Sequence, residues 1–124
     1  MQATQAQVQR SGLDVLNALL KARPLPGIFR SLGFQPVDVR EGYAVFEGTP
    51  DDQVYNLLGI VHGGYAAALL DSACGGAVHT MLPPGQTYTA LDLKVAYHRA
   101  MDRHTGPVRA VGQVQSLGRR AGFA

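Results

Sequence analysis

Apolar and polar positions along the chain fall into stretches with different periods, and the first has the period of a helix. Leucines recur at helical spacing after Ser11, a residue type that favours helix caps, with Asp14 at the third position after it. Pro24 and Pro26 end this helix. The pattern therefore predicts an N-terminal helical segment of about 11–30.

The rest of the chain predicts strands around one long helix. Apolar and polar residues alternate over 34–40 and 43–47, on either side of Glu41-Gly42, which predicts a hairpin. Residues 62–81 are rich in Ala and Leu, which predicts a helix. Residues 88–98 and 108–117 have the composition typical of strands. This order predicts an α+β fold in which an antiparallel sheet packs on one buried helix.

Composition places this fold in a single domain, 1–124. The chain has 124 residues, of which 46% are hydrophobic, enough to form a core. No stretch offers about 20 apolar residues in a row, so we expect no membrane span. One cysteine excludes a disulfide framework and favours a reducing, cytoplasmic location.

Charge is distributed unevenly. Residues 1–91 hold five Lys/Arg and seven Asp/Glu, a balance of −2, whereas 92–124 hold six Lys/Arg and two Asp, a balance of +4. A basic end suits a small polyanion such as a phosphorylated cofactor, and a solvated strand face explains it equally well. The basic residues lack interleaved aromatics, which disfavours a nucleic-acid partner.

Asp71 is the single formal charge between Gln53 and Leu91. It lies in the middle of a helix that is apolar or small on every side, a pattern typical of a buried helix. An ionised carboxylate buried without partners is costly, so this one must be paired, neutralised or exposed to a cleft. Two interpretations remain open: a carboxylate bonded to loop backbone or facing a local solvent gap, or one in an apolar cleft with a raised pKa, acting as base or nucleophile.

The entrance to this helix, His62-Gly63-Gly64, is the second candidate feature. Free N–H groups at a helix start can polarise a carbonyl, and glycines let a ligand approach the backbone closely. Gly63 and Asp71 are eight residues apart, about 12 Å along a helix. If both act on one carbonyl, they come from different subunits, which predicts a composite site in a homodimer.

The motif Asn56–His62-Gly63-Gly64–Asp71 resembles the hot-dog-fold thioesterases of the phenylacetate-degradation (PaaI-like) type. The likeness covers roughly residues 12–124. It implies a curved antiparallel sheet wrapped around one long central helix, assembled as a homodimer or homotetramer. It also implies hydrolysis of acyl-CoA thioesters, with no metal and no cofactor beyond the CoA of the substrate.

The resemblance also assigns roles. Asp71 activates water or attacks the thioester, the Gly63 N–H of the partner subunit polarises the carbonyl, Asn56 holds the thioester or water, and His62 supports the loop. Tyr65 suits either an acyl pocket or the core. The residues expected at the substrate are Gly64, Tyr65, Thr89, Ala90, Arg119 and Arg120, with the two arginines facing the CoA phosphates.

Two departures from the family pattern keep alternatives open. Ala90 stands where many relatives carry a hydroxyl, and Thr89 points to the other face of a strand. The chain ends at Ala124, where the family continues through a further strand, so we expect a shortened final strand. Both features favour a non-catalytic acyl-CoA-binding module as the main alternative. A hot-dog dehydratase or hydratase is a second alternative. The acyl group is not specified by the sequence.

Overall fold

Two short helices open the described part of the molecule. The computed structural model describes residues 9–124, and α2 (Gly12–Lys21) and α3 (Gly27–Leu32) come first. Ser11 caps α2 as predicted, because its hydroxyl accepts the Asp14 N–H at 3.1 Å. The expected helical segment is divided in two because its prolines cannot continue a helix.

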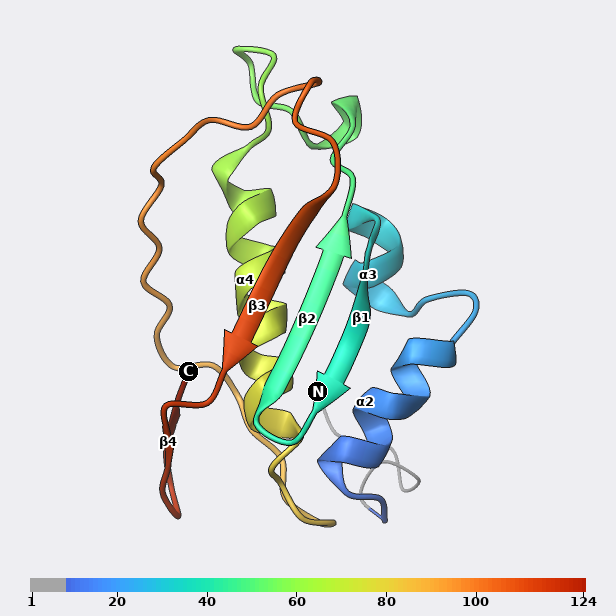
Figure 1. Cartoon of the computed structure of the whole chain (residues 1–124), viewed down its shortest axis with the longest axis vertical. Helices are drawn as coiled ribbons and strands as arrows, with labels where there is room; N and C mark the ends of the chain where they lie inside the picture. Colours follow the sequence, from blue (N-terminus) through green and yellow to red (C-terminus); the bar gives the residue numbers. More distant parts are fainter. Residues whose placement is uncertain (1–8) are drawn as a thin grey trace.

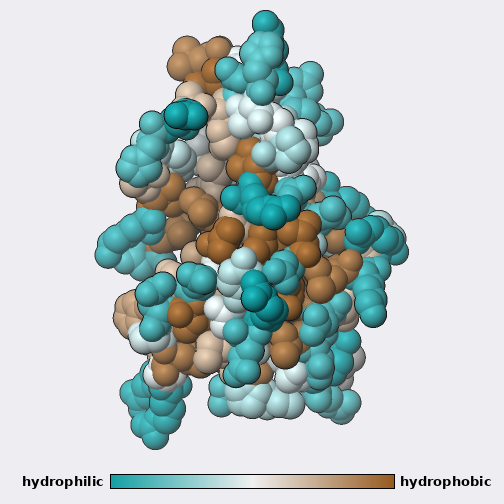
Figure 2. Space-filling model, viewed as in Figure 1, coloured by the Kyte–Doolittle hydropathy of each residue, from teal (hydrophilic) through white to brown (hydrophobic). Residues whose placement is uncertain are grey.

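A three-stranded antiparallel sheet forms the front layer in Figure 1. Its order is β1 (Phe34–Arg40), β2 (Tyr43–Gly48) and β3 (Val108–Gln113). The predicted hairpin between β1 and β2 is confirmed, and Gly42 in its turn has a φ of 73°, a conformation that glycine adopts at little cost. On the face turned toward the reader, apolar surface is bordered by hydrophilic side chains (Figure 2).

The long helix α4 (Gly63–His79) packs against the back of this sheet, as predicted. Phe46 of β2 and Leu69 of α4 are each only 1% exposed. A Cβ atom built on Gly112 of β3 would lie 2.1 Å from the Ala73 carbonyl oxygen. The lack of a side chain on Gly112 therefore lets helix and sheet approach closely.

The expectation that α4 is buried on every side is wrong for the single chain. One face is buried, and Asp71 on the helix is exposed. Only one face of α4 packs against the sheet. The sheet therefore leaves the Asp71 side of the helix uncovered, although the residues around Asp71 are apolar or small. The buried positions are Tyr65, Leu69, Ala73, Gly76 and Ala77.

The strand predicted over 88–98 does not form within the described residues. This segment runs extended along the side of α4 away from α2 and α3 (Figure 1), and Leu91 is 87% exposed. A strand needs a neighbouring backbone for its hydrogen bonds, and no described strand pairs with this segment. The strand predicted over 108–117 is divided into β3 and β4 (Ser116–Leu117), and β4 pairs with β5 (Gly122–Phe123).

The remaining connection, between β2 and α4, contains a single short 3₁₀ helix, η1 (Asp52–Val54). Tyr55 and Val61 then form an isolated antiparallel bridge, which brings the chain back to the start of α4. None of the helices formed by residues 9–124 combines the length and the apolar character that crossing a membrane requires.

Candidate active site

The first turn of α4 leaves one backbone donor open. His62 is the N-cap, and its Nδ1 accepts the Gly64 N–H at 2.7 Å. The His62 carbonyl accepts the Tyr65 N–H at 3.0 Å. Between these two, the Gly63 N–H donates to no acceptor among the described residues. The open amide stands at the positive end of the helix dipole, where it can bind an anion or a polarised carbonyl oxygen.

Asn56 organises the loop that leads to this turn. Its Oδ1 accepts the N–H groups of Leu58 at 2.9 Å and Ile60 at 3.3 Å. Its backbone N–H donates to the Ile60 carbonyl at 2.8 Å. These bonds fix which end of the amide is oxygen, and they leave the side-chain NH₂ as a donor. Asn56 therefore holds the loop and still carries donors that the loop does not use.

A shallow cavity of about 350 Å³ adjoins the open amide. Asn56, Gly63 and Ala66 line one wall, and residues 97–101 line the other. The Val61 N–H donates to the Met101 carbonyl at 2.9 Å, which ties the two walls together. Asn56 and Gly63, two of the predicted catalytic residues, thus share one cavity.

Tyr97 is a residue of this site that the sequence did not single out. Its hydroxyl donates to the Gly63 carbonyl at 2.7 Å, although 59% of the residue is exposed. A Cβ atom built on Gly63 would lie 3.2 Å from the phenol ring. The strand-type composition of 88–98 predicted that Tyr97 belongs to a strand, but composition alone could not show which backbone group its hydroxyl meets.

Asp71 lies apart from this cavity. It is exposed on the middle of α4 and does not line the space beside Gly63. The predicted apolar cleft around it is not formed by the described part of one chain. Of the two interpretations drawn from the sequence, solvent exposure therefore describes Asp71 within a single chain.

The surroundings of Asp71 include two groups that stay protonated near neutral pH. Burial raises the pKa of the Cys74 thiol, and the nearby Asp71 carboxylate raises it further. Burial likewise raises the pKa of Tyr88, again with a smaller contribution from Asp71. Tyr88 is 45% exposed overall, but its hydroxyl end lies against α4, 2.6 Å from a Cβ atom built on Gly75. Cys74 is therefore a poor nucleophile, because the reactive form of a cysteine is the thiolate.

The structure disperses the remaining predicted substrate residues. Tyr65 is 3% exposed, packs edge-on against Phe34 in the core, and its hydroxyl has no partner among the described groups. Gly64 is capped in the first turn of α4, while Thr89 and Ala90 are exposed in the extended segment.

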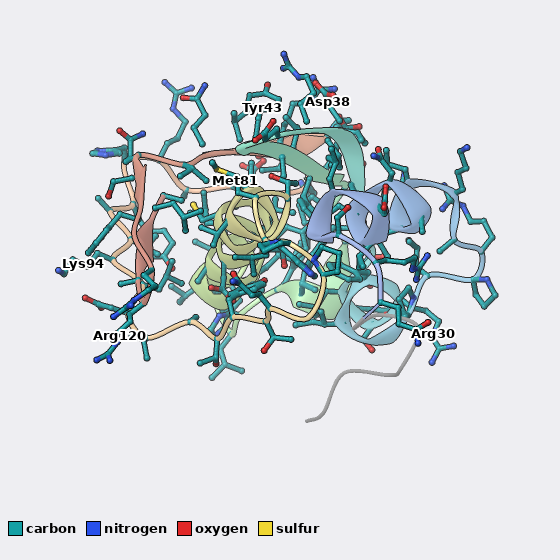
Figure 3. The ribbon with its side chains drawn as sticks, turned by 90° about the horizontal axis from the view of Figure 1, so that it is seen from below. Arg30, Asp38, Tyr43, Met81, Lys94 and Arg120 are labelled. Carbon is teal, nitrogen blue, oxygen red and sulfur yellow. The ribbon has the colours of Figure 1, made fainter. Side chains whose placement is uncertain are left out.

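The predicted CoA-phosphate residues lie at the C-terminal hairpin. Arg119 and Arg120 are exposed in the turn between β4 and β5. Arg120 and Lys94 lie on the same side of the molecule (Figure 3), and Arg30 lies on the opposite side. Lys94 forms an exposed ion pair with Asp92 at 3.2 Å.

An antiparallel sheet packed on one long central helix is the architecture of the hot-dog class of thioester hydrolases. The chain belongs to the Thioesterase superfamily, which matches residues 58–124. The predicted fold and enzyme class are thereby confirmed.

Solved structures agree with this assignment. A mutant of the phenylacetic acid degradation protein PaaI from Thermus thermophilus is 29% identical over 76% of this chain and 77% of that one, with a TM-score of 0.68. A Haemophilus influenzae thioesterase is 25% identical over 86% and 71%, with a TM-score of 0.70. The E. coli PaaI protein is 23% identical over 90% and 75%, with a TM-score of 0.74, and shows the same fold.

Proposed function

We propose that this protein hydrolyses acyl-CoA thioesters at a site shared by two copies of the chain. Asp71 of one copy activates water or attacks the thioester carbon, and the Gly63 N–H of the other copy polarises the carbonyl. The observation that carries the proposal is the Gly63 N–H, which is open while the amides of Gly64 and Tyr65 are satisfied.

The open amide has the properties of an oxyanion donor. A thioester carbonyl gains negative charge on oxygen as it is attacked, and a fixed N–H at a helix start stabilises that charge without reorganising. Such a donor typically contributes about 10²–10³-fold to the rate. The cavity beside Gly63 offers room for the substrate arm.

Helix geometry supports the second copy. The eight residues from Gly63 to Asp71 span about 12 Å, too far for both to act on one carbonyl from one helix. Asp71 is exposed on a helix side that the sheet leaves uncovered, so a second copy can approach it. In a two-fold assembly the Asp71 of each copy would face the Gly63 of the other, giving two equivalent sites.

The reaction needs only water and the chain's own groups. Asp71 takes a proton from water as the oxygen attacks the carbonyl carbon, and the oxyanion rests on the Gly63 N–H. The tetrahedral intermediate collapses, the carbon–sulfur bond breaks, and the CoA sulfur leaves with a proton. In the nucleophilic variant, Asp71 first forms a mixed anhydride and releases CoA, and water then cleaves the anhydride.

Other residues supply binding. The free NH₂ of Asn56 donates to the thioester or the water, and His62 keeps the first turn of α4 in place through its bond to Gly64. Arg119 and Arg120 face the CoA phosphates, and no metal or redox cofactor takes part. The free Cys74 suits a reducing compartment, which supports a cytoplasmic location.

The test is thiol release from aryl, short-chain and medium-chain acyl-CoAs, combined with subunit complementation. Asp71→Asn removes the base, and Gly63→Pro removes the N–H. Each variant alone should lose about 99% or more of the wild-type activity. In a co-expressed equal mixture, heterodimers contain one intact site, so about a quarter of the wild-type sites should recover. Complementation that fails in a proven heterodimer would refute the shared site.

Ala90 favours a second candidate, a non-catalytic acyl-CoA-binding module. Its methyl group offers no hydrogen bond to the attacking water. For this candidate, calorimetry should detect acyl-CoA binding while the thiol assay detects no release. Thiol release above background that disappears in Asp71→Asn excludes it.

A further inference from the structure

Tyr97 connects two parts of the molecule that are distant in sequence. It belongs to the extended segment after α4, and its hydroxyl donates to the Gly63 carbonyl at 2.7 Å in the first turn of that helix. Its ring also covers Gly63, since an added Cβ would lie 3.2 Å from the ring carbon that carries the hydroxyl. Tyr97 therefore contacts the residue that carries the open amide.

The Gly63–Gly64 peptide is held at both of its polar atoms. Tyr97 donates to its carbonyl oxygen, and Nδ1 of His62 accepts its N–H at 2.7 Å. Two consecutive glycines have the widest choice of backbone angles, so this peptide would otherwise be the most variable part of the turn. Holding it restricts the rotation of Gly63, and with it the direction of the Gly63 N–H.

We propose that Tyr97 is a positioning residue, which holds the first turn of α4 so that the Gly63 N–H points at the substrate carbonyl. The inference rests on the proposed function, because it assigns the amide to the thioester. An added Cβ at position 63 would lie 3.2 Å from the phenol ring, a contact that the exposed ring can relieve by a small shift. The same ring lines the cavity, so Tyr97 sets both the donor and the wall beside it.

The variant Tyr97→Phe tests this, because it removes the hydroxyl and keeps the ring. A single hydrogen bond of this kind is worth about a factor of 2 to 13, so we expect kcat for acyl-CoA hydrolysis to fall about five- to tenfold. KM and the inhibition constant of free CoA should stay within about twofold of wild type, because the hydroxyl acts through the backbone donor. The thermal midpoint should fall by no more than about 5 °C, since the variant loses one hydrogen bond at an exposed site.

Tyr43→Phe is the matched control. Tyr43 lies on the sheet beside Arg40, whose guanidinium carbon is 4.0 Å from the ring centroid, and it does not line the cavity beside Gly63. Its variant loses the same hydroxyl and should keep wild-type kcat and KM.

A double-mutant comparison separates positioning from a general structural effect. In a Gly63→Pro background the donor is already gone, so adding Tyr97→Phe should change the residual rate less than twofold. An equal five- to tenfold loss in both backgrounds would overturn the inference, as would a rise in KM that matches the loss.

The outcomes also separate this inference from the proposed function. Wild-type kcat in Tyr97→Phe, with Asp71→Asn inactive, overturns the role of Tyr97 and leaves the proposed function standing. A wild-type protein that releases no thiol from any acyl-CoA overturns both.

Discussion

The first turn and the middle of α4 differ in how much of their surroundings one chain supplies. Around Gly63, the cap from His62, the loop held by Asn56 and the contact from Tyr97 all come from the same chain. Around Asp71, one chain leaves the carboxylate exposed. One chain therefore fixes the geometry of the Gly63 part of the proposed site by itself. The Asp71 part is left exposed by that chain, so a second surface has to cover it.

Much of this difference follows from the range of the interactions involved, and the Tyr97 contact, which joins residues 34 positions apart, is the exception. The cap and the loop bonds join residues two to four positions apart, so they form with the turn itself. The exposed side of α4 and the segment over 88–98 can be covered only by a distant surface. Leu91, 87% exposed on that segment, shows how much apolar surface is left there.

Asp71→Asn should produce the largest effect. Losing a general base typically costs about 10²–10⁴-fold, so kcat should fall by that range, as measured by thiol release. The unfolding free energy should change by less than about 0.5 kcal/mol, because Asp71 is exposed. Asp38→Asn, which removes an exposed carboxylate of β1, is the control and should keep full activity. Substantial turnover by Asp71→Asn would remove this residue from the mechanism.

Gly63→Pro tests the Gly63 part of the site, where the backbone N–H is the proposed donor. Proline is tolerated at the first position of a helix, and His62 already has the extended conformation that precedes proline, with φ −63° and ψ 136°. The variant loses the N–H donor and gains a contact between the proline ring and Tyr97, and kcat should fall about 10²–10³-fold through loss of the donor.

Gly63→Ala is the paired control for this proline variant. It adds a similar contact with Tyr97 and keeps the N–H, so most of the activity should remain. Equal losses in the proline and alanine variants would show that crowding, and not the donor, limits the rate.

Leu91→Lys tests whether a second copy covers the Asp71 part of the site. Burying a leucine at an interface contributes about 1.5–3 kcal/mol, so the charge should weaken self-association roughly tenfold or more. Analytical ultracentrifugation would measure this, and activity should fall at low protein concentration and recover at high concentration. Ile28→Lys on α3, where Ile28 is 49% exposed, is the control. Unchanged association of Leu91→Lys would place the contact elsewhere.

His79, at the far end of α4, predicts the smallest effect. Burial lowers the pKa of His79 below the ordinary value of 6.5. As the pH falls, this histidine therefore becomes protonated more readily in the unfolded chain than in the folded chain. The free energy of unfolding is therefore unaffected by His79 above about pH 6.5, and it decreases as the pH falls toward the lowered pKa.

Urea unfolding at several pH values would measure this slope, and His79→Gln should flatten it. A slope that persists in His79→Gln would assign the pH dependence to other groups.

The sequence anticipated most of the local structure. The Ser11 cap, the hairpin around Gly42 and the extent of α4 were all predicted, because each depends on neighbours within a few residues. The motif from Asn56 to Asp71 likewise indicated the family, which the superfamily match confirms. The contact of Tyr97 with Gly63 could not be predicted, because it joins residues 34 positions apart.

The sequence by itself determined which residues are the candidates for the proposed chemistry: a lone carboxylate on a helix without other charges, and the glycines that follow a histidine. Tertiary structure alone decided which of these groups meet. The sheet covers one face of α4 and leaves the Asp71 side open, and an extended segment brings a tyrosine onto the first turn. Pattern and propensity report on the nearest few residues, whereas burial and contact depend on surfaces that chain folding brings together from a distance.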